Sequence, residues 1–461
     1  MVINKSSIFK WCNECNVPVL GKKCGCGSSE ILIKISYPGD VRIVFEAESK
    51  NIDDIISKYY GSEARVKSKI ILANKRGGYD KTNELIIDGI MVGVLSFDIV
   101  SRQHKFVPTA RGEFYFTKRM KERVKEIPLP LSGFLKGKVF KWDKNILKRD
   151  YGIVKSAGKL LFIRKRESDY KIIDVVLNKE YCSKENSIKK MLDMNMNHLK
   201  KIESEAKIML RSHIQKYPEM PVNVAFSGGK DSLVVLDIAE SVLKNVDVYF
   251  VDTGFELAQT TEFVKSFGSK VDILKTSSDF LADFSKLGPP TKDNRWCSKR
   301  LKLDPIFNHI KKKYPEGCLT VGGKRALESF SRAKSMPEEK NPFVPCQISV
   351  YPILKWKAID VFSYILMKKL KYNPLYDLGF DRVGCYMCPA QLEGDSLLVS
   401  KVSPELFKEW RNLLYKWAEK NNFSKKYINL GLWRWKELPK KMKELATDMN
   451  INTVSSLKKK K

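Results

Sequence analysis

Residues 227–232 have the composition of a turn that binds phosphate. They read Ser227, Gly228, Gly229, Lys230, Asp231 and Ser232, and they lie between an apolar run and a segment of helical character. This order predicts a buried strand, a tight turn and the start of a helix. The glycines let the backbone approach an anion, while the hydroxyls, the free amides and the lysine attract it. The spacer of a Walker A loop is missing, so a different class of nucleotide site is indicated.

Cysteines form a second group of reactive residues, and four of the ten lie near the N-terminus. Cys12 with Cys15 and Cys24 with Cys26 form two close pairs with glycines around the second. Thiolates at this spacing can converge tetrahedrally on one ion, which predicts a small zinc ribbon over residues 1–29. The second pair has one intervening residue instead of two, so a redox-active cysteine pair is the alternative.

A third cysteine pair, Cys385 and Cys388, precedes Pro389. Its spacing is typical of a metal knuckle or of half an iron-sulfur site. Zinc, an iron-sulfur cluster and plain core cysteines therefore remain open for this pair, because both kinds of metal site prefer thiolates.

The elements that must position these residues differ between the two halves of the chain. After residue 222, expected strands at 246–251, 271–274 and 319–321 alternate with expected helices near 232–243, 259–267 and 302–313. This order predicts an open parallel sheet wound on both faces, with a ligand beyond the carboxyl ends of its strands. A helix over 196–215 leads into the phosphate turn, and 404–444 is expected to be helical and rich in aromatic residues.

Residues 30–180 alternate short apolar runs with turns, which predicts a β-rich region. The expected strands are 31–36, 41–45, 69–73, 85–88, 90–97, 106–108 and 113–116, followed by a second block at 152–164 and 170–177. With the ribbon at 1–29, we expect four parts: the ribbon, the β-rich region 30–180, the sheet domain 195–395 and a basic helical tail 400–461.

The charge balance points to a polyanionic partner. The 461 residues contain 84 Lys+Arg against 53 Asp+Glu, a formal net charge of +31. Such an excess favours nucleic acid through counterion release, whereas a lysine-rich host proteome would normally raise glutamate as well. No apolar run reaches the roughly eighteen residues of a membrane span, and no apolar leader is visible. We therefore expect a cytoplasmic location, no membrane association and contact with tRNA or another RNA.

The turn and five further segments resemble one enzyme superfamily in the same order. Residues 227–232 resemble the PP-loop of the N-type ATP pyrophosphatases, whose members bind ATP or an adenylated sulfate there. Segments of the phosphoadenylyl-sulfate (PAPS) reductases are similar to FVDTGFELAQTTEFV at 250–264, RWCSKRLKLDP at 295–305, VGGKRALESFSR at 321–332, and 351–365 with 372–389.

The resemblance implies an adenine nucleotide site with magnesium. Its ligands would be the turn residues together with Asp252, Thr253, Gly254, Lys302 and Arg332, and catalytic roles would belong to Lys230, Asp231, Cys297 and Arg325. A carboxylate such as Asp252 can hold a ribose hydroxyl or magnesium, and the basic side chains can neutralise phosphate or sulfate oxygens.

The resemblance also implies a [4Fe-4S] cluster. Cys297 stands where cluster-bearing relatives have cysteine, so the ligands would be Cys297, Cys385 and Cys388, with Cys346 as the fourth or no fourth ligand. The family's thioredoxin-dependent reductases carry a nucleophilic cysteine near the C-terminus. This chain has no cysteine after Cys388, so that thiol is missing.

In the front half, IIDGIMVGVLSFD at 86–98 resembles the domain that precedes the PUA module in archaeal tRNA-guanine transglycosylases. Residues 152–177 could then be a divergent PUA-like barrel that binds RNA. A β-rich domain that serves protein contacts is the alternative.

Three functions fit these features. The preferred one is an ATP-dependent, AMP-forming sulfurtransferase that adenylates and sulfurates a tRNA base. The second is an adenylyl-sulfate or PAPS reductase that forms sulfite, and the third is a nucleotide-dependent RNA-binding protein without turnover. The substrate base, the sulfur or electron donor and the oligomeric state do not follow from the sequence.

Overall fold

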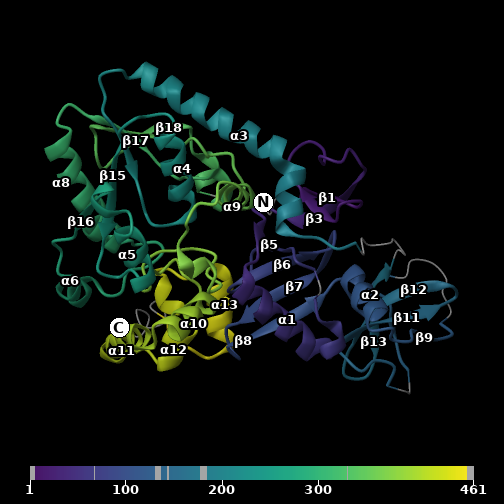
Figure 1. Ribbon diagram of the computed structural model, residues 1–461. Helices are drawn as coiled ribbons and strands as arrows, with labels where there is room; N and C mark the ends of the chain where they lie inside the picture. Colours follow the sequence, from purple (N-terminus) through teal and green to yellow (C-terminus); the bar gives the residue numbers. More distant parts are fainter. Residues whose placement is uncertain are drawn as a thin grey trace. The chain divides into compact units, whose positions relative to one another are not determined.

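The computed structural model describes residues 6–66, 68–129, 136–142, 145–176, 184–329 and 331–453 (Figure 1). The chain divides into two compact units, each described here by itself. Unit 1 contains Met1–Arg76, Thr82–Ser96 and His104–His198, and unit 2 contains Gly77–Lys81, Phe97–Gln103 and Leu199–Lys461. Two short segments of the front half therefore belong to unit 2. The isolated Cys182 and the basic end at 458–461 lie outside the described residues.

Unit 1 contains three sheets. The first has the order β2-β1-β3, the second β4-β5-β6-β7-β8 and the third β10-β13-β12-β11-β9. The bounds of the strands are β1 Ser6–Cys12, β2 Val17–Val19, β3 Glu30–Ser36, β4 Arg42–Ile43, β5 Ile71–Lys75, β6 Thr82–Ile87, β7 Ile90–Asp98, β8 Gln103–Pro108, β9 Lys125–Glu126, β10 Val139–Phe140, β11 Tyr151–Ser156, β12 Lys159–Lys165 and β13 Tyr170–Val176.

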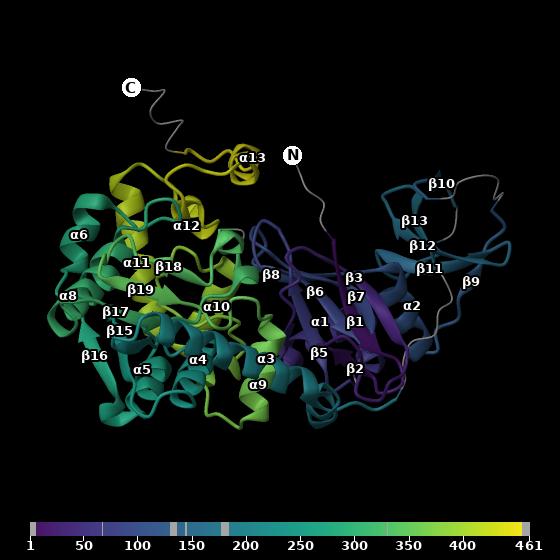
Figure 2. The same cartoon turned by 90° about the horizontal axis from the view of Figure 1, so that it is seen from above.

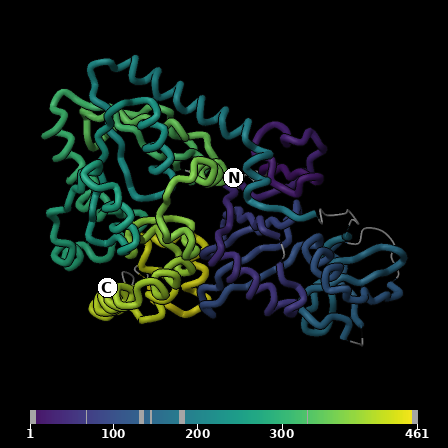
Figure 3. Tube along the Cα trace, in the orientation of Figure 1, coloured from purple at the N-terminus to yellow at the C-terminus, as the bar shows by residue number. Residues whose placement is uncertain are grey.

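The predicted strand at 113–116 is wrong, because these residues lie in helix α2, Ala110–Arg119. The side chain of Thr109 accepts a hydrogen bond from the amide of Gly112 and so caps the helix. Tyr115 and Phe116 are buried from one face of it, as helical spacing allows. The other helices of the unit are α1, Glu46–Tyr60, the short 3-10 turn η1, Ser62–Ala64, and the first part of α3, Ile188–Lys216, which continues into unit 2 (Figure 3).

Unit 2 is built on a six-stranded sheet of the order β16-β15-β14-β17-β19-β18 (Figure 2). Its strands are β14 Val222–Ala225, β15 Asp247–Asp252, β16 Val271–Lys275, β17 Cys318–Val321, β18 Glu338–Lys340 and β19 Gln347–Val350. All neighbours pair in parallel except β18 with β19. The chain first builds outward from β14 to β16 and then returns to β17 on the other side of β14.

Helices cover both faces of this sheet. On one face, Ile310 of α8 (Asp304–Lys313) packs against Tyr249 and Cys318. On the other face, Met209 of α3 packs with Leu319, and Phe226 meets Phe263 of α5, Ala258–Lys265. The predicted doubly wound arrangement is present.

The remaining elements of the unit are α4 Lys230–Glu240, η2 Gly268–Lys270, α6 Phe280–Leu287, α7 Trp296–Ser298, η3 Lys299–Leu303, η4 Ala326–Glu328, η5 Arg332–Lys334, α9 Ala358–Met367, η6 Pro374–Tyr376, α10 Glu393–Val402, α11 Pro404–Lys420, α12 Lys425–Asn429, η7 Leu432–Arg434 and α13 Lys440–Asp448.

The helices after residue 400 belong to the core of unit 2. Trp410, Leu414 and Trp433 share a buried apolar cluster with Phe280 and Trp296. The aromatic residues of this region therefore pack helices, as expected of most such residues in a helical segment.

Candidate nucleotide and cysteine site

The phosphate turn joins β14 to α4. Gly228 has a φ of +70°, a left-handed conformation that favours glycine, and Gly229 precedes the first residue of the helix. The amide of Ser227 donates to Ser232 Oγ over 3.1 Å, and that hydroxyl donates to the carbonyl of Gly229 over 2.9 Å. The two serines thus hold the turn closed.

The turn lies where the winding of the sheet changes direction. β14 pairs with β15 on one side and with β17 on the other, so the carboxyl ends of β14 and β17 border the crevice in which such sheets bind ligands. Gly323, which follows β17, lies against the turn. A Cβ on Gly323 would fall 2.6 Å from the carbonyl carbon of Asp231, so only glycine fits there.

Three predicted catalytic residues form one ionic cluster beneath the turn. Arg325 Nε donates to Asp231 Oδ1 over 2.5 Å, and Lys230 Nζ donates to Asp231 Oδ2 over 2.7 Å. Arg325 is 1% exposed and Lys230 is 7% exposed. Burial raises the pKa of Asp231, but the Arg325 guanidinium and the Lys230 ammonium more than offset this and lower it to about 2. The carboxylate therefore positions the turn and pairs with two buried cations, which leaves one net positive charge in the cluster.

Two residues that the sequence did not single out also hold the turn. The amide of Lys230 donates to Tyr376 Oη over 2.9 Å, and Asn373 Nδ2 donates to the carbonyl of Gly228 over 3.2 Å. Both residues are buried and lie in the segment 372–389 that resembles the reductases. No spacing rule identifies them, because they reach the turn from a distant loop.

The predicted residues at the carboxyl end of β15 divide into two kinds. Asp252 Oδ1 accepts from the amide of Gly254 over 2.9 Å and remains partly exposed at the strand end. Thr253 is 1% exposed, and its hydroxyl donates to Glu256 over 2.9 Å. Asp252 is thus placed to meet a ligand, whereas Thr253 and the unpredicted Glu256 support the loop.

Cys297, Cys385 and Cys388 come together around Lys302. Cys385 Sγ lies 3.5 Å from Thr253 Oγ1 and 3.5 Å from Glu256 Oε1. Burial raises the pKa of the Cys297 thiol to about 11, with further contributions from Cys388 and Cys385. Burial lowers the pKa of Lys302, but Cys385, Glu256 and Cys388 outweigh it and raise that pKa. Lys302 lies in a π-helical segment, Lys299–Leu303, a form that is frequent at functional sites.

Cys346 does not join this group, which corrects the predicted ligand set. Its carbonyl accepts from the amide of Cys318 over 3.0 Å at the starts of β17 and β19. Cys385 lies beside Thr253, which follows the carboxyl end of the parallel strand β15. Opposite edges of the sheet therefore separate Cys346 from Cys385. The two cysteines lie apart because Cys346 directly precedes the start of β19, and not because it is far from Cys385 along the sequence.

The N-terminal cysteines, in contrast, form a compact group. The sulfurs of Cys12, Cys15, Cys24 and Cys26 all lie within 4.8 Å of one another, the one such group of His, Cys, Asp or Glu within the described part of the chain. A tetrahedral ion with Zn–S bonds of about 2.3 Å places its sulfurs roughly 3.8 Å apart. The group can hold a single metal ion.

The predicted Arg332 and the neighbouring basic residue Lys324 are engaged locally. Arg332 pairs with Glu328 in the loop after β17, and Lys324 Nζ lies 2.6 Å from Glu339 Oε2. Their side chains remain 37% and 25% exposed. Among the contacts described, neither side chain bonds directly to residues 227–232.

Most of the chain is similar to two proteins of Methanocaldococcus jannaschii. It is 36% identical to Uncharacterized protein MJ0973 over 85% of this chain and 95% of that protein. It is 32% identical to Uncharacterized protein MJ0066 over 93% of this chain and 96% of that protein. The chain belongs to their family.

Residues 221–391 of the chain match the family of the phosphoadenosine phosphosulfate reductase domain. Adenosine 5'-phosphosulfate reductase 2 of Bacillus subtilis is 27% identical over 36% of this chain and 70% of its own length. The crystal structure of PAPS reductase from Candida auris, as its phosphate complex, aligns with a TM-score of 0.33 and 21% identity over 42% of this chain and 96% of that chain. The reductase-type domain thus contains the phosphate turn, the Asp231 cluster and the three later cysteines.

No helix among the described residues is both long and apolar enough to cross a membrane.

Proposed function

We propose that this protein is an adenine-nucleotide-dependent enzyme that adenylates a carbonyl of a tRNA base and replaces its oxygen with sulfur. One observation carries the proposal: the three cysteines and the phosphate turn lie at the same edge of the sheet. Cys385 contacts Thr253 directly after β15, and Ser227 lies two residues after the end of β14, the parallel neighbour of β15. A bound nucleotide and a sulfur-bearing group would therefore meet there.

The proposed reaction uses two displacements. The base carbonyl oxygen attacks the α-phosphorus of ATP, the α–β anhydride bond breaks and pyrophosphate leaves. Hydrosulfide, supplied as inorganic sulfide, then adds to the activated carbon, and the carbon–oxygen bond breaks to release AMP. The thiocarbonyl retains the sulfur, and the proton of hydrosulfide passes to solvent. No electrons are exchanged.

The chain's own residues would bind and orient the reactants. The amides and hydroxyls of residues 227–232 would hold the phosphates. Asp252 would bind the ribose or magnesium, and Lys302 would neutralise charge beside the cysteines.

Cys297, Cys385 and Cys388 fit a three-cysteine [4Fe-4S] cluster better than one zinc ion. They interact electrostatically, but they are not among the groups whose ligand atoms all lie within 4.8 Å in the described residues. A cluster is larger than an ion and needs sulfurs farther apart. When bound, it would supply an iron site for sulfur.

A second candidate function is favoured by the relatives named adenosine 5'-phosphosulfate reductase. Here adenylyl sulfate and two electrons from a dithiol would give sulfite and AMP. Residues 389–461 contain no cysteine that could act as the nucleophile used by thioredoxin-dependent relatives, which disfavours this candidate. The charge of +31 also favours a nucleic-acid substrate.

The test is a pair of reactions on anaerobically purified protein. One contains ATP, sodium hydrosulfide and unmodified tRNA, with pyrophosphate, AMP and thiolated nucleosides measured. The other contains adenylyl sulfate and dithiothreitol, with sulfite measured. Thiolation with stoichiometric AMP supports the proposal, and sulfite formation without thiolation overturns it in favour of the reductase.

Metal analysis provides a matched control. Cys385→Ser should lose iron and acid-labile sulfide, whereas Cys346→Ser should retain both, because Cys346 lies at the opposite edge of the sheet. Equal iron loss in the two variants would contradict the ligand set Cys297, Cys385 and Cys388.

A further inference from the structure

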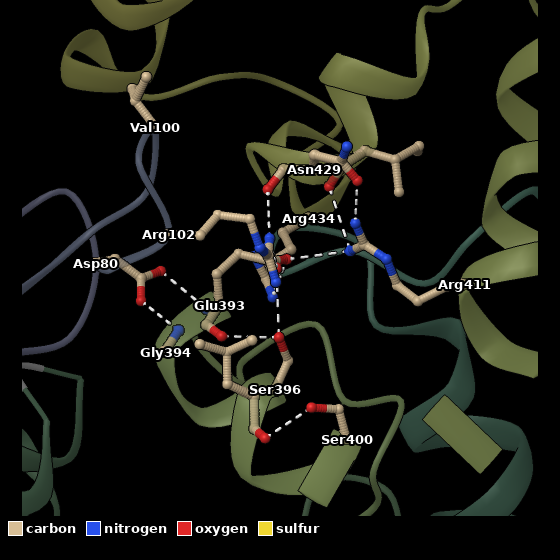
Figure 4. A network of polar contacts seen from close by, with 12 residues as sticks. Asp80, Val100, Arg102, Glu393, Gly394, Ser396, Ser400, Arg411, Asn429 and Arg434 are labelled. Atoms are coloured by element: carbon tan, nitrogen blue, oxygen red, sulfur yellow. Dashed lines mark hydrogen bonds and ion pairs between the residues drawn. The ribbon is translucent and has the colours of Figure 1, made fainter. Parts of the chain in front are cut away.

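The helix that follows the second cysteine pair is capped by a residue from a distant part of the sequence (Figure 4). α10 begins at Glu393, shortly after Cys388, and its own N-cap residue, Leu392, forms no side-chain hydrogen bond to it. Asp80 instead accepts from the amides of Glu393 and Gly394 over 2.9 and 2.7 Å. The first amides of a helix have no partner within it, so the carboxylate of Asp80 supplies the missing cap.

The next residue, Lys81, contacts both sides of the cysteine pair. Its Nζ lies 2.7 Å from Asp395 Oδ1 and 4.0 Å from Asp381 Oδ2. Asp381 precedes the two cysteines in the sequence and Asp395 follows them. The Lys81 side chain is 11% exposed, so salt screens these contacts less than it screens a surface ion pair. One ammonium group thus joins the two ends of residues 381–395, which we call the cysteine segment.

A second short segment of the front half, 97–103, reaches the same helix start. Arg102 Nη1 lies 3.2 Å from the carboxylate of Glu393, which is fully buried (Figure 4). The amide of Phe97 donates to the carbonyl of Lys81 over 2.7 Å. The two short segments are therefore bonded to each other as well as to α10.

Backbone hydrogen bonds connect the cysteines to this capped helix. The amide of Cys388 donates to the carbonyl of Cys385 over 3.1 Å, and the amide of Gln391 donates to the carbonyl of Cys388 over 2.9 Å. Between the two cysteines, the amide of Tyr386 donates to the carbonyl of Phe255 over 2.9 Å. Successive turns thus lead from the cysteine pair to the first residue of α10.

We propose that Asp80 and Lys81 are positioning residues for Cys385 and Cys388. They fix the ends of the cysteine segment, so that the two sulfurs keep their place beside Lys302. Neither residue is among those expected to bind the nucleotide or the metal, and both act through the backbone of the segment. The consequence for a bound cluster rests on the proposed function, whereas the ordering of the segment does not.

Hydrogen–deuterium exchange, measured by mass spectrometry on the full-length protein purified anaerobically, tests the ordering. Asp80→Ala should speed the exchange of amides 385–394 about fivefold, the change expected for the loss of one helix cap. Lys81→Met should speed it as well, while the amides of β17 exchange as in wild type. Unchanged exchange at 385–391, or an equal acceleration in β17, would overturn the proposal.

Two further variants serve as controls. Asp80→Asn keeps one acceptor oxygen and should give an exchange rate between those of wild type and Asp80→Ala. Thr109→Ala removes the N-cap of α2 in unit 1 and should leave the cysteine segment unchanged. The same acceleration in Thr109→Ala would assign the effect to general destabilisation and would also overturn the proposal.

Release of bound iron to a chelator tests the consequence for the cysteines. Asp80→Ala should release iron faster than wild type, and Thr109→Ala at the wild-type rate. Equal release from all three proteins would refute the positioning role, and a protein without iron leaves the decision to the exchange measurement. Since neither assay contains ATP, sulfide or tRNA, a failure of thiolation refutes the proposed function alone.

Discussion

At the scale of single residues, the ionic contacts of Asp231 stabilise the phosphate turn as much as the conformation of its glycines does. Asp231 accepts from Arg325 and Lys230, so two of the basic residues predicted to act on substrate are bound to a carboxylate. Their positive charges can still attract phosphate, but their first task is to fix the turn. The turn could be predicted from the spacing of residues 227–232. That Asp231 binds Arg325 and Lys230 could be seen only in the structure.

We expect Asp231→Asn to destabilise the protein as well as reduce nucleotide binding. Removing one partner of a buried ionic cluster costs about 3–5 kcal/mol, because Arg325 keeps its charge without compensation. Asp252→Asn is the control: its partly exposed carboxylate should change the free energy of unfolding by only about 0.5 kcal/mol. Urea denaturation measures both. A loss below about 1 kcal/mol in Asp231→Asn would show that the cluster is not structural.

Glu113 should make the stability of unit 1 depend on pH. Burial raises the pKa of this carboxyl from 4.5 to about 7, although Tyr60 and Arg149 lower it. The folded state then binds more protons than the unfolded state between these values, so this group stabilises most below pH 4.5. The contribution falls by about 3 kcal/mol as pH rises to 7.

Denaturant unfolding at pH 4.5, 5.5 and 7 would measure this slope. Glu113→Gln should flatten it, and Glu126→Gln, at an exposed position, should leave it unchanged. A wild-type stability that rises across the same interval, with no difference in Glu113→Gln, would contradict the assignment.

At the scale of elements, the alternation of apolar and helical segments was enough to predict the parallel sheet and the place of the turn. The prediction was wrong at 113–116. A short apolar run is compatible with the period of a strand and with that of a helix, and the N-cap formed by Thr109 favours the helix. It also could not place Cys346, since the edge of a sheet at which a residue lies depends on strand direction. Tyr376 and Asn373 act through contacts with a segment far away along the sequence, for which the sequence offers no periodic signal.

The N-terminal cysteines should bind one zinc ion per chain and stabilise the sheet β2-β1-β3. Cys12 closes β1 at its pairing with Val17, so the metal would tie the ends of these strands together. Structural zinc supplies folding free energy directly. We expect Cys15→Ser to lose the zinc and to lower the melting temperature of unit 1, as a strong chelator would in the wild type.

The control for this prediction is Cys318→Ser, a buried cysteine on β17 outside the group. Elemental analysis should find its zinc unchanged. Zinc that persists at full occupancy in Cys15→Ser would rule out the four-cysteine site.

At the scale of the whole molecule, the net charge of +31 should govern binding to RNA. Each phosphate contact by lysine or arginine releases counterions, so the logarithm of the tRNA association constant should fall linearly with the logarithm of salt concentration. Replacing the exposed Lys121 and Arg123 by glutamine should reduce the slope by about 2 in filter binding. Lys420→Gln, exposed on α11, should not change it. Equal slopes in all three proteins would place the RNA surface elsewhere.

The two units are interleaved along the sequence, and this restricts how recombination can separate their coding regions. Asp80 and Arg102 belong to unit 2, yet their codons lie within the part of the gene that encodes unit 1. A recombination event that transferred residues 199–461 alone would deliver α10 without Asp80 at its first amides and Glu393 without one of its arginines. The similarity to the two Methanocaldococcus proteins accordingly extends over 95% and 96% of their lengths. We therefore expect the two units to be inherited together, encoded by a single gene.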